Sequence, residues 1–205
     1  MIKRVMCFGD SNTWGFNPLS RTRYEKEVRW TGRLAGLLGE EYEIIEEGLN
    51  GRTTAFPDLI EPYRCGLDYI GPCVLSHTPF DLMILMLGTN DAKERFHVSS
   101  REISYGIEEL IGRTRFLLGE EAPQILIVSP IPMEEIEGGE FTESSRERVK
   151  GLAAEYERVA KDFGCGFLDA AKVVTQPGPD KVHMTPEQHA RLAEAIARKI
   201  KEMLK

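Results

Sequence analysis

Residues 82–87 read Leu82-Met83-Ile84-Leu85-Met86-Leu87, and this uninterrupted apolar run decides the fold. A strand with one face in water alternates polar and apolar residues, whereas this run has no such alternation. It is therefore typical of a central strand in a parallel sheet, where helices cover both faces. We expect it to lie at the centre of the molecule.

Outward from this run, short apolar segments alternate with longer amphipathic ones, which is the pattern of an α/β protein. The predicted strands are residues 3–8, 42–46, 82–87, 124–129 and 167–168. The predicted helices are residues 30–38, 67–76, 101–118, 143–163 and 186–204. Because a helix follows each strand, we predict a three-layer α/β/α sandwich with a five-stranded parallel sheet in flavodoxin-like order.

The ends of three predicted helices carry capping signals. Gly39 and Gly164 follow helical segments, where we expect them to form left-handed C-terminal caps. Before the last helix, Thr185 can cap the first turn and Pro186 suits the first helical position. Gln188 stands where a capping box requires Glu or Gln. These signals support the helical assignment of all three segments.

The composition is that of an ordinary soluble domain. At 205 residues the chain is long enough for one domain, so we predict a single domain over residues 1–205. The 26 Lys and Arg against 33 Asp and Glu give a formal net charge of −7. Because phosphate binding requires a basic stripe, this charge argues against a nucleic-acid partner or an anionic membrane partner.

The cysteines and the amino-terminal residues indicate the cellular compartment in which we expect the protein. The four cysteines form no C-x-x-C pair and no cysteine–histidine cluster with zinc spacing, so we expect mostly buried free thiols and no metal. Residues 1–10 lack a signal-peptide pattern, and no apolar stretch approaches the roughly 20 residues that span a bilayer. We therefore predict a cytoplasmic protein.

Ligands of such a sheet bind outside the carboxyl ends of its strands. Five segments follow the predicted strands, namely residues 9–15, 48–54, 88–91, 130–142 and 175–183. We expect all five to gather at one rim of the sheet, which is where chemistry should be sought.

Three of these segments hold residues that could serve acyl chemistry. Ser11 follows the first strand, where its hydroxyl could project into a cleft, although a capping serine has the same pattern. Asn90 offers an uncharged N–H donor suited to a transient oxyanion, although an Asx turn also explains it. Gly48 and Gly51 would let backbone N–H groups approach a ligand, as they would in a plain turn.

The last segment contains Asp180-Lys181-Val182-His183, directly before the final helix. A carboxylate three residues before a histidine can bend back, accept the Nδ1–H and leave Nε2 as a proton acceptor, which is what triad chemistry requires. A helix-start pair with a half-buried histidine is the alternative. The other histidines, His77, His97 and His189, fit structural or exposed positions.

Four short blocks of this chain resemble those of the SGNH hydrolases, the GDSL-type esterase and lipase superfamily. They contain, in this order and each at a strand end, a serine, a glycine, an asparagine and the pattern Asp-x-x-His. The blocks read Gly9-Asp10-Ser11, Asn50-Gly51-Arg52-Thr53-Thr54, Gly88-Thr89-Asn90-Asp91 and Asp180-Lys181-Val182-His183. The resemblance spans nearly the whole chain. More narrowly, four segments are similar to the bacterial arylesterase and acyltransferase branch: Cys7-Phe8-Gly9-Asp10-Ser11, Val28-Arg29-Trp30-Thr31-Gly32, Glu46-Glu47-Gly48-Leu49 and Met86-Leu87-Gly88-Thr89-Asn90-Asp91. One departure is Asn12, where that branch usually has leucine.

The resemblance implies a serine esterase that hydrolyses small carboxylic esters, with short acyl or aryl groups, through an acyl-serine intermediate. Ser11 would be the nucleophile, His183 its base, and Asp180 the residue that orients the base. The oxyanion would be held by the backbone N–H groups of Ser11 and Gly51 and by the side-chain amide of Asn90. Transfer of the acyl group to an added alcohol is a second activity implied by the resemblance.

Further expectations concern the surroundings of the triad. Asn12, Trp14 and Phe16 are predicted to line the substrate pocket, with a place in the apolar core as the alternative for the two aromatic residues. No metal or organic cofactor is required by this chemistry. The branch resemblance implies a homo-oligomer, with residues 17–28 and 130–142 as candidate contacts.

Three alternatives stay open on the sequence. The run Ser11-Asn12-Thr13-Trp14-Gly15 after a strand also resembles the flavodoxin phosphate loop, which would make the chain an FMN-binding electron carrier. The fold could also serve a ligand-binding or assembly protein without catalysis. Among esterases, Asn12 beside the serine and Glu134-Glu135 in the fourth segment favour an enzyme that deacetylates sugars.

Overall fold

The computed structural model describes residues 2–205 and contains one parallel sheet in the order β2-β1-β3-β4-β5. Its strands are β1 (Lys3–Gly9), β2 (Tyr42–Gly48), β3 (Leu82–Met86), β4 (Gln124–Val128) and β5 (Gly166–Leu168). This is the flavodoxin-like strand order. The predicted five-stranded parallel sheet is therefore confirmed, and its bounds differ from the sequence prediction by at most two residues.

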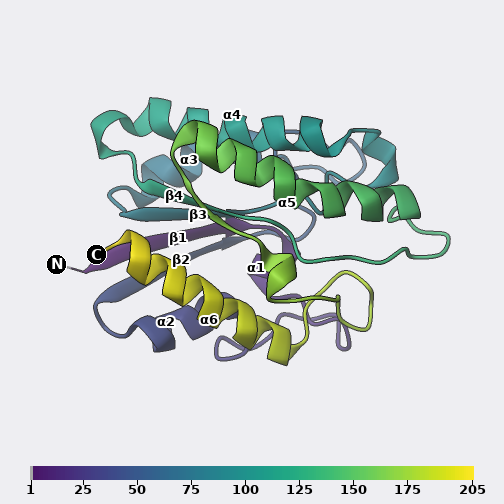
Figure 1. The fold of residues 1–205 in the computed structure, drawn as a ribbon, viewed down its shortest axis with the longest axis horizontal. Coiled ribbons are helices and arrows are strands. Elements are labelled where there is room, and N and C mark those ends of the chain that lie inside the picture. Colours follow the sequence, from purple (N-terminus) through teal and green to yellow (C-terminus); the bar gives the residue numbers. More distant parts are fainter. Residues whose placement is uncertain (1) are drawn as a thin grey trace.

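Long helices cover both faces of the sheet (Figure 1). The helices α2 (Trp30–Leu38) and α6 (Pro186–Met203) pack against each other on one face. On the other face α4 (Ser100–Leu118) lies between α3 (Gly66–His77) and α5 (Glu143–Phe163). The predicted three-layer α/β/α sandwich is confirmed by this arrangement.

The central strand β3 explains why its sequence has no polar position. Leu82 and Ile84 are fully buried among residues of α2 and α6, whereas Met83 and Leu85 are fully buried among residues of α3, α4 and α5. Successive side chains of a strand point to opposite faces, so a strand between two helical layers needs apolar residues throughout. Complete burial of each such side chain contributes about 1.5–3 kcal/mol.

The helix ends agree with most of the capping signals. Thr185 and Gln188 close the predicted capping box, with Pro186 in the first turn of α6. Gly164 ends α5 in the left-handed conformation, with φ 62° and ψ 42°. Gly39 ends α2 with φ 80° but ψ −173°, so the predicted left-handed cap is wrong there, because the chain leaves the helix extended on its way to β2.

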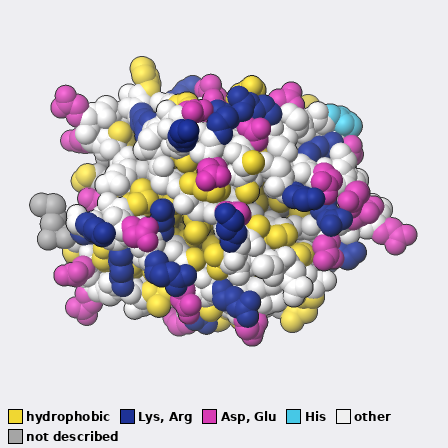
Figure 2. Space-filling view, viewed as in Figure 1, with side chains coloured by type: hydrophobic (Ala, Val, Ile, Leu, Met, Phe, Trp, Pro, Cys, Tyr) yellow, Lys and Arg dark blue, Asp and Glu magenta, His cyan; other side chains and the backbone are white. Residues whose placement is uncertain are grey.

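Three further features of the structure concern the surface charges, the cysteines and the apolar character of the helices. Acidic and basic side chains are interspersed over the face shown in Figure 2. Cys7, Cys65 and Cys73 are buried free thiols, as expected, and Cys165 is half-buried. Within residues 2–205, no helix combines the length and the apolar character that crossing a bilayer requires.

The fully buried His189 joins α6 to α2. Its Nδ1 accepts a hydrogen bond of 3.2 Å from the backbone N–H of Trp30, at the start of α2. Burial lowers the pKa of His189 to about 3, and the nearby cationic groups of Arg33, His183 and Arg29 act in the same direction. The imidazole is therefore neutral in the folded protein at any pH near neutrality.

We expect the stability of the protein at mildly acidic pH to report on His189. An unfolded histidine titrates near about pH 6.5, so below that pH the unfolded chain binds a proton that the folded chain excludes. The contribution of this group is complete above about pH 6.5 and is lost towards about pH 3, by roughly 1.4 kcal/mol per pH unit. His189→Asn retains an acceptor near Trp30 without this titration. In urea unfolding, the wild type should lose about 2 kcal/mol relative to the variant between about pH 7 and pH 5.

His97, whose side chain is exposed, provides the matched control for this experiment. His97→Asn should leave the pH dependence of the unfolding free energy as it is in the wild type. A difference between wild type and His189→Asn that stays constant over the same pH range would contradict the prediction.

Candidate active site

A cleft of about 310 Å³ lies at the carboxyl ends of the strands. The register of the sheet places Gly9 beside both Gly48 and Met86, so the segments that follow β1, β2 and β3 leave the sheet at the same edge. Each of the five segments expected at this rim contributes to the cleft or borders it. The lining residues are Ser11, Phe16, Asn50, Gly51, Glu61, Arg64, Asn90, Lys93, Phe141, Val182 and His183.

Ser11 opens a one-turn helix, α1 (Ser11–Trp14), which the sequence patterns do not predict. Asp10 caps this turn by accepting a hydrogen bond of 2.9 Å from the Asn12 backbone N–H. Gly15 ends the turn in the left-handed conformation, with φ 87°. The first N–H groups of a helix have no partner within the helix, so the Ser11 N–H lies at a position suited to an anion.

Three side chains form a continuous chain of hydrogen bonds in the cleft. His183 Nε2 lies 2.8 Å from Ser11 Oγ, and His183 Nδ1 lies 2.6 Å from Asp180 Oδ2. The other carboxylate oxygen, Asp180 Oδ1, accepts hydrogen bonds from the backbone N–H groups of His183 at 2.9 Å and Val182 at 3.2 Å. The sequence-predicted serine, histidine and aspartate are thus brought together in the order that triad chemistry requires.

The charge of Asp180 follows from these contacts. Burial is the largest single influence on its pKa and acts to raise it. The hydrogen bonds from the ring and backbone of His183 and from the Val182 N–H together outweigh burial, so the pKa of Asp180 lies below its usual value. An ionised carboxylate therefore faces Nδ1, which holds the proton of the imidazole there and leaves Nε2 as an acceptor towards Ser11.

Two glycines after β2 have different environments. Gly48 packs against α1, where a Cβ atom would lie 2.3 Å from the backbone nitrogen of Trp14. Gly51 lines the cleft with φ 77°, a conformation that side-chain-bearing residues rarely adopt. Across the cleft mouth, the Asn90 amide donates to the Arg52 carbonyl at 3.1 Å, and its second N–H is left for a ligand. Gly51 and Asn90 therefore line the same cleft as Ser11, and the oxyanion role of their N–H groups stays a prediction.

A buried carboxylate fixes the loop after β2 to the loop after β3. Asp91 Oδ1 accepts hydrogen bonds from the backbone N–H of Thr54 at 2.8 Å and from its hydroxyl at 2.5 Å. Burial raises the pKa of Asp91 to about 6, and burial likewise raises the pKa of Asp10 to about 6. The buried guanidinium of Arg52 donates to the Gly9 carbonyl at 3.0 Å and so ties the same loop to the nucleophile turn.

The comparisons with known proteins agree with this geometry. The model of the GDSL-like lipase/acylhydrolase family matches residues 7–191. The chain belongs to this family. As a GDSL-family member it is a carboxylic ester hydrolase, and its fold is the SGNH hydrolase fold.

The proteins similar to this GDSL-family chain include esterases of solved structure and a further esterase matched by sequence. A carbohydrate acetylesterase from Sinorhizobium meliloti is 37% identical, with a TM-score of 0.92 over 98% of this chain and 99% of the other. An aryl esterase from M. smegmatis is 36% identical, also with a TM-score of 0.92, over 98% and 99%. An acetylxylan esterase from Xylanibacter ruminicola is 27% identical over 97% of this chain, which spans only 43% of that protein.

The residues expected to line the substrate pocket have three different positions. Phe16 lines the cleft and packs on the His183 ring, with 4.4 Å between ring centroids. Trp14 lies outside the cleft lining, where the Arg23 guanidinium stacks on its indole at 5.3 Å. Asn12 is buried beneath the cleft. Trp14 and Asn12 therefore differ from the expected substrate contacts.

The contacts of Asn12 explain its position. Its amide donates to the Val182 carbonyl at 3.3 Å, and its Oδ1 accepts a hydrogen bond of 3.1 Å from the Met184 N–H. Both ends of the side chain are thus occupied by the loop that carries His183. Asn12 therefore links the nucleophile turn to the loop that carries His183.

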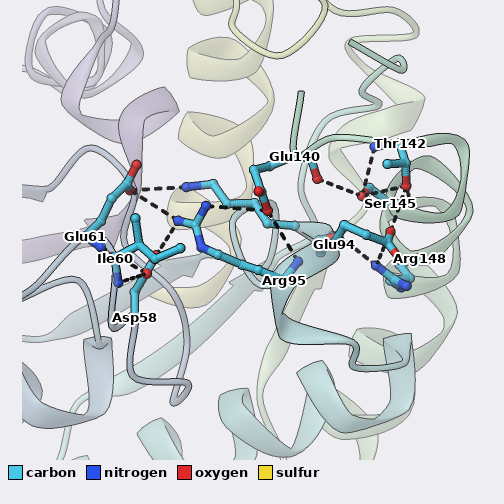
Figure 3. A network of polar contacts seen from close by, with 11 residues as sticks. Asp58, Ile60, Glu61, Glu94, Arg95, Glu140, Thr142, Ser145 and Arg148 are labelled. Carbon is cyan, nitrogen blue, oxygen red and sulfur yellow. Dashed lines mark hydrogen bonds and ion pairs between the residues drawn. The ribbon is translucent and has the colours of Figure 1, made fainter. Parts of the chain in front are cut away.

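Sequence reasoning missed one side of the cleft, which comes from residues 58–64 and from the turn after Asn90. Lys93 pairs with Glu61 at 3.2 Å, and Arg95 lies 3.7 Å from the same carboxylate. Arg95 also pairs with Asp58 and with Glu140, so three separate loops meet in this network (Figure 3). No motif in the sequence marks Glu61 or its neighbour Arg64. Lys93 lies just after the Gly88-Thr89-Asn90-Asp91 block, and this position is the one sequence signal for its place at the cleft.

One group of side chains has the residue types of a metal site. Ligand atoms of Glu47, Cys73 and His77 lie within 4.8 Å of one another, away from the residues that line the cleft. His77 Nε2 already pairs with Glu47 at 2.9 Å. Burial, with a smaller contribution from the charge of Glu47, raises the pKa of the Cys73 thiol to about 12. The contact between Glu47 and His77 therefore already satisfies two of the three side chains of this group.

Proposed function

We propose that this GDSL-family hydrolase cleaves small carboxylic esters, with short acyl or aryl groups, through an acyl intermediate on Ser11. The observation that carries the proposal is the 2.8 Å contact between Ser11 Oγ and His183 Nε2, with Asp180 on the far side of the ring. A serine hydroxyl at this distance from a neutral imidazole can give up its proton as it attacks a carbonyl carbon.

In the first half of the reaction His183 Nε2 takes the proton from Ser11 Oγ while Oγ bonds to the ester carbonyl carbon. The carbonyl π electrons move to oxygen, giving a tetrahedral oxyanion beside the N–H groups of Ser11, Gly51 and Asn90. When this intermediate collapses, its C–O bond to the alcohol breaks and His183 gives its proton to the leaving oxygen. Asp180 stabilises the imidazolium that exists between the two transfers.

In the second half, water attacks the acyl-serine while His183 again acts as the base. The ester bond to Ser11 breaks, Oγ regains a proton from His183, and the carboxylic acid leaves. An alcohol that enters the cleft instead of water would take the acyl group, so acyl transfer belongs to the same proposal.

The cleft favours short substrates. Its volume of about 310 Å³ is at the lower end for small-molecule sites, and Phe16 and Phe141 supply its apolar wall. A long alkyl chain would have to remain in water, which forfeits about 0.8 kcal/mol per CH₂ of possible burial.

Deacetylation of carbohydrates is a second candidate activity, supported by the relatives from Sinorhizobium meliloti and Xylanibacter ruminicola. The charged groups of Glu61, Arg64 and Lys93 at the cleft would suit a hydrated sugar better than a lipid. Both candidates use the same acyl-serine chemistry, and they differ only in the alcohol that leaves.

Rates on four esters should separate these activities. We expect kcat/KM for p-nitrophenyl acetate to exceed that for a long-chain p-nitrophenyl ester by at least about tenfold, because only the short acyl group is fully enclosed. Acetylated xylose should be compared with phenyl acetate in the same buffer, with spontaneous hydrolysis subtracted. Faster cleavage of the sugar ester would favour the carbohydrate esterase, and a preference for the long chain would contradict the proposal.

The homo-oligomer that the resemblance implies stays a prediction. Of its two candidate contact segments, residues 17–28 expose Leu19, whose side chain is 80% accessible. Residues 130–142 instead support the active site from within the chain, since the Glu134 N–H donates to the Lys181 carbonyl at 2.9 Å beside the histidine loop. An interface through residues 17–28 is therefore better supported than one through residues 130–142.

A further inference from the structure

Arg64 lies in the cleft beside the residues proposed to bind the oxyanion. A Cβ atom on Gly51 would be 2.8 Å from Glu61 Oε2, 3.2 Å from Arg64 Nε and 3.3 Å from Arg64 Cδ, so both side chains cover this glycine, which lines the cleft. The Arg64 backbone is held separately, because its carbonyl accepts a hydrogen bond of 3.0 Å from the Thr53 N–H. The loop fixes the main chain and leaves the guanidinium directed at the cleft.

The guanidinium of Arg64 has no partner among residues 2–205. Its Nε–H is buried and donates to no acceptor, and none of the ion pairs in this part of the chain includes Arg64. The neighbouring cations have ion-pair partners, Lys93 with Glu61 and Arg95 with Asp58 and Glu140, although Arg95 Nε also lacks an acceptor. A buried donor without an acceptor is costly, so a donor of this kind in a binding cleft indicates a group supplied by the ligand.

The charges around Arg64 leave it available for an anion. Glu61 is the only carboxylate among the residues lining the cleft, and its Oε2 lies 3.2 Å from Lys93 Nζ and 3.7 Å from Arg95. Two cations therefore share Glu61, whereas no ion pair among residues 2–205 includes Arg64, although Glu61 lies beside the same glycine. A guanidinium presents a planar set of N–H donors that matches a carboxylate, often with two parallel hydrogen bonds.

We propose that Arg64 determines specificity by binding a carboxylate carried by the ester substrate, so that the preferred substrates are esters with an anionic group. This inference rests on the proposed esterase function and adds a charge requirement to it. The carboxylate can belong to the acyl part or to the alcohol part of the ester, and the two sources are separated by the choice of substrates.

The acyl source is tested with mono-p-nitrophenyl glutarate and its methyl ester, which share a leaving group and differ in one charge. The alcohol source is tested with p-acetoxybenzoate and its methyl ester. In one of these pairs the wild type should prefer the anionic member, and Arg64→Gln should lower kcat/KM for that member by about 10- to 100-fold, mainly through KM. The same variant should leave kcat/KM for both methyl esters within about twofold.

Two further variants sharpen the experiment. Arg113→Gln removes an exposed arginine of α4 and the same unit of charge, and it should leave all four rates unchanged. Arg64→Lys keeps the charge without the planar donors, and it should retain part of the preference and lose it as ionic strength rises. Arg64→Lys also serves as the test if Arg64→Gln fails to fold.

The outcomes distinguish this inference from the proposed function. If the methyl esters are hydrolysed in a reaction that depends on Ser11, but the wild type prefers neither anionic ester, then only the proposed role of Arg64 is overturned. Equal losses on anionic and neutral esters in Arg64→Gln would also overturn it, since they would indicate a structural role. If no ester is hydrolysed in a reaction that depends on Ser11, the proposed esterase function itself is wrong.

Discussion

Ser11→Ala is expected to lower kcat on a short p-nitrophenyl ester by about 10⁴- to 10⁶-fold. The hydroxyl is the group that forms the covalent bond to the substrate, so no acyl intermediate can arise without it. What remains is the modest acceleration that the oxyanion donors and the cleft provide to direct attack by water. The rate should be measured under saturating substrate, with a burst of p-nitrophenol used to count active sites in the wild type.

Ser20→Ala is the matched control, because Ser20 is an exposed serine in the loop that follows α1. It should retain the wild-type rate. A fluorophosphonate probe should label the wild type and the control but not Ser11→Ala, since only an activated serine reacts quickly. Wild-type turnover by a folded Ser11→Ala would reject the assignment of the nucleophile, and an unlabelled wild type would favour a binding protein without catalysis.

The fold could be predicted because its strongest signal depends on one physical requirement. A strand between two helical layers has no solvent-facing side, and residues 82–87 contain no polar residue. Once this strand is central, the alternation of strands and helices leaves few arrangements of the remaining elements. The flavodoxin-like order was also predicted, although alternation alone fits more than one order, and the structure has this order.

The convergence of Ser11, Gly51 and Asn90 was predictable for a related reason. Carboxyl ends of parallel strands lie at one edge of the sheet, so residues just after different strands must be neighbours. The prediction needed only the position of each residue relative to its strand. No long-range side-chain geometry had to be known.

Side-chain direction within α1 was beyond the sequence. Asn12 was expected in the pocket because it follows Ser11, but adjacent residues of a helical turn point about 100° apart. The structure directs Ser11 to the cleft and Asn12 towards the backbone of residues 182 and 184. The unusual polar residue at position 12 is explained by these two hydrogen bonds.

The side of the cleft formed by residues 58–64 was missed for a different reason. This loop has no hydrophobic period and no motif, and its shape depends on distant contacts such as the hydrogen bond from the Thr53 N–H to the Arg64 carbonyl. The ion pairs of Arg95 with Asp58 and Glu140 hold it against two other loops (Figure 3). Sequence patterns report local preference, and this side of the cleft is a product of tertiary contacts.

Asp180→Asn tests the orientation of the base, and the structure predicts how the new amide will lie. Asp180 Oδ1 accepts two backbone N–H groups, whereas Oδ2 faces His183 Nδ1. The oxygen of an asparagine must take the Oδ1 place to satisfy those two donors, so its NH₂ group points at Nδ1. An NH₂ group there donates a hydrogen bond to Nδ1 and forces the imidazole proton onto Nε2.

An imidazole protonated on Nε2 cannot accept the proton of Ser11, so we expect Asp180→Asn to lower kcat by about 10⁴-fold. Asp180→Ala removes the carboxylate without imposing the wrong tautomer and should be less severe than Asp180→Asn, and less severe than His183→Ala, because a poorly held imidazole still accepts protons. Steady-state rates of the three variants on p-nitrophenyl acetate give this order directly. A loss below about tenfold in Asp180→Asn would mean that another base serves Ser11, because a blocked Nε2 leaves the hydroxyl without an acceptor.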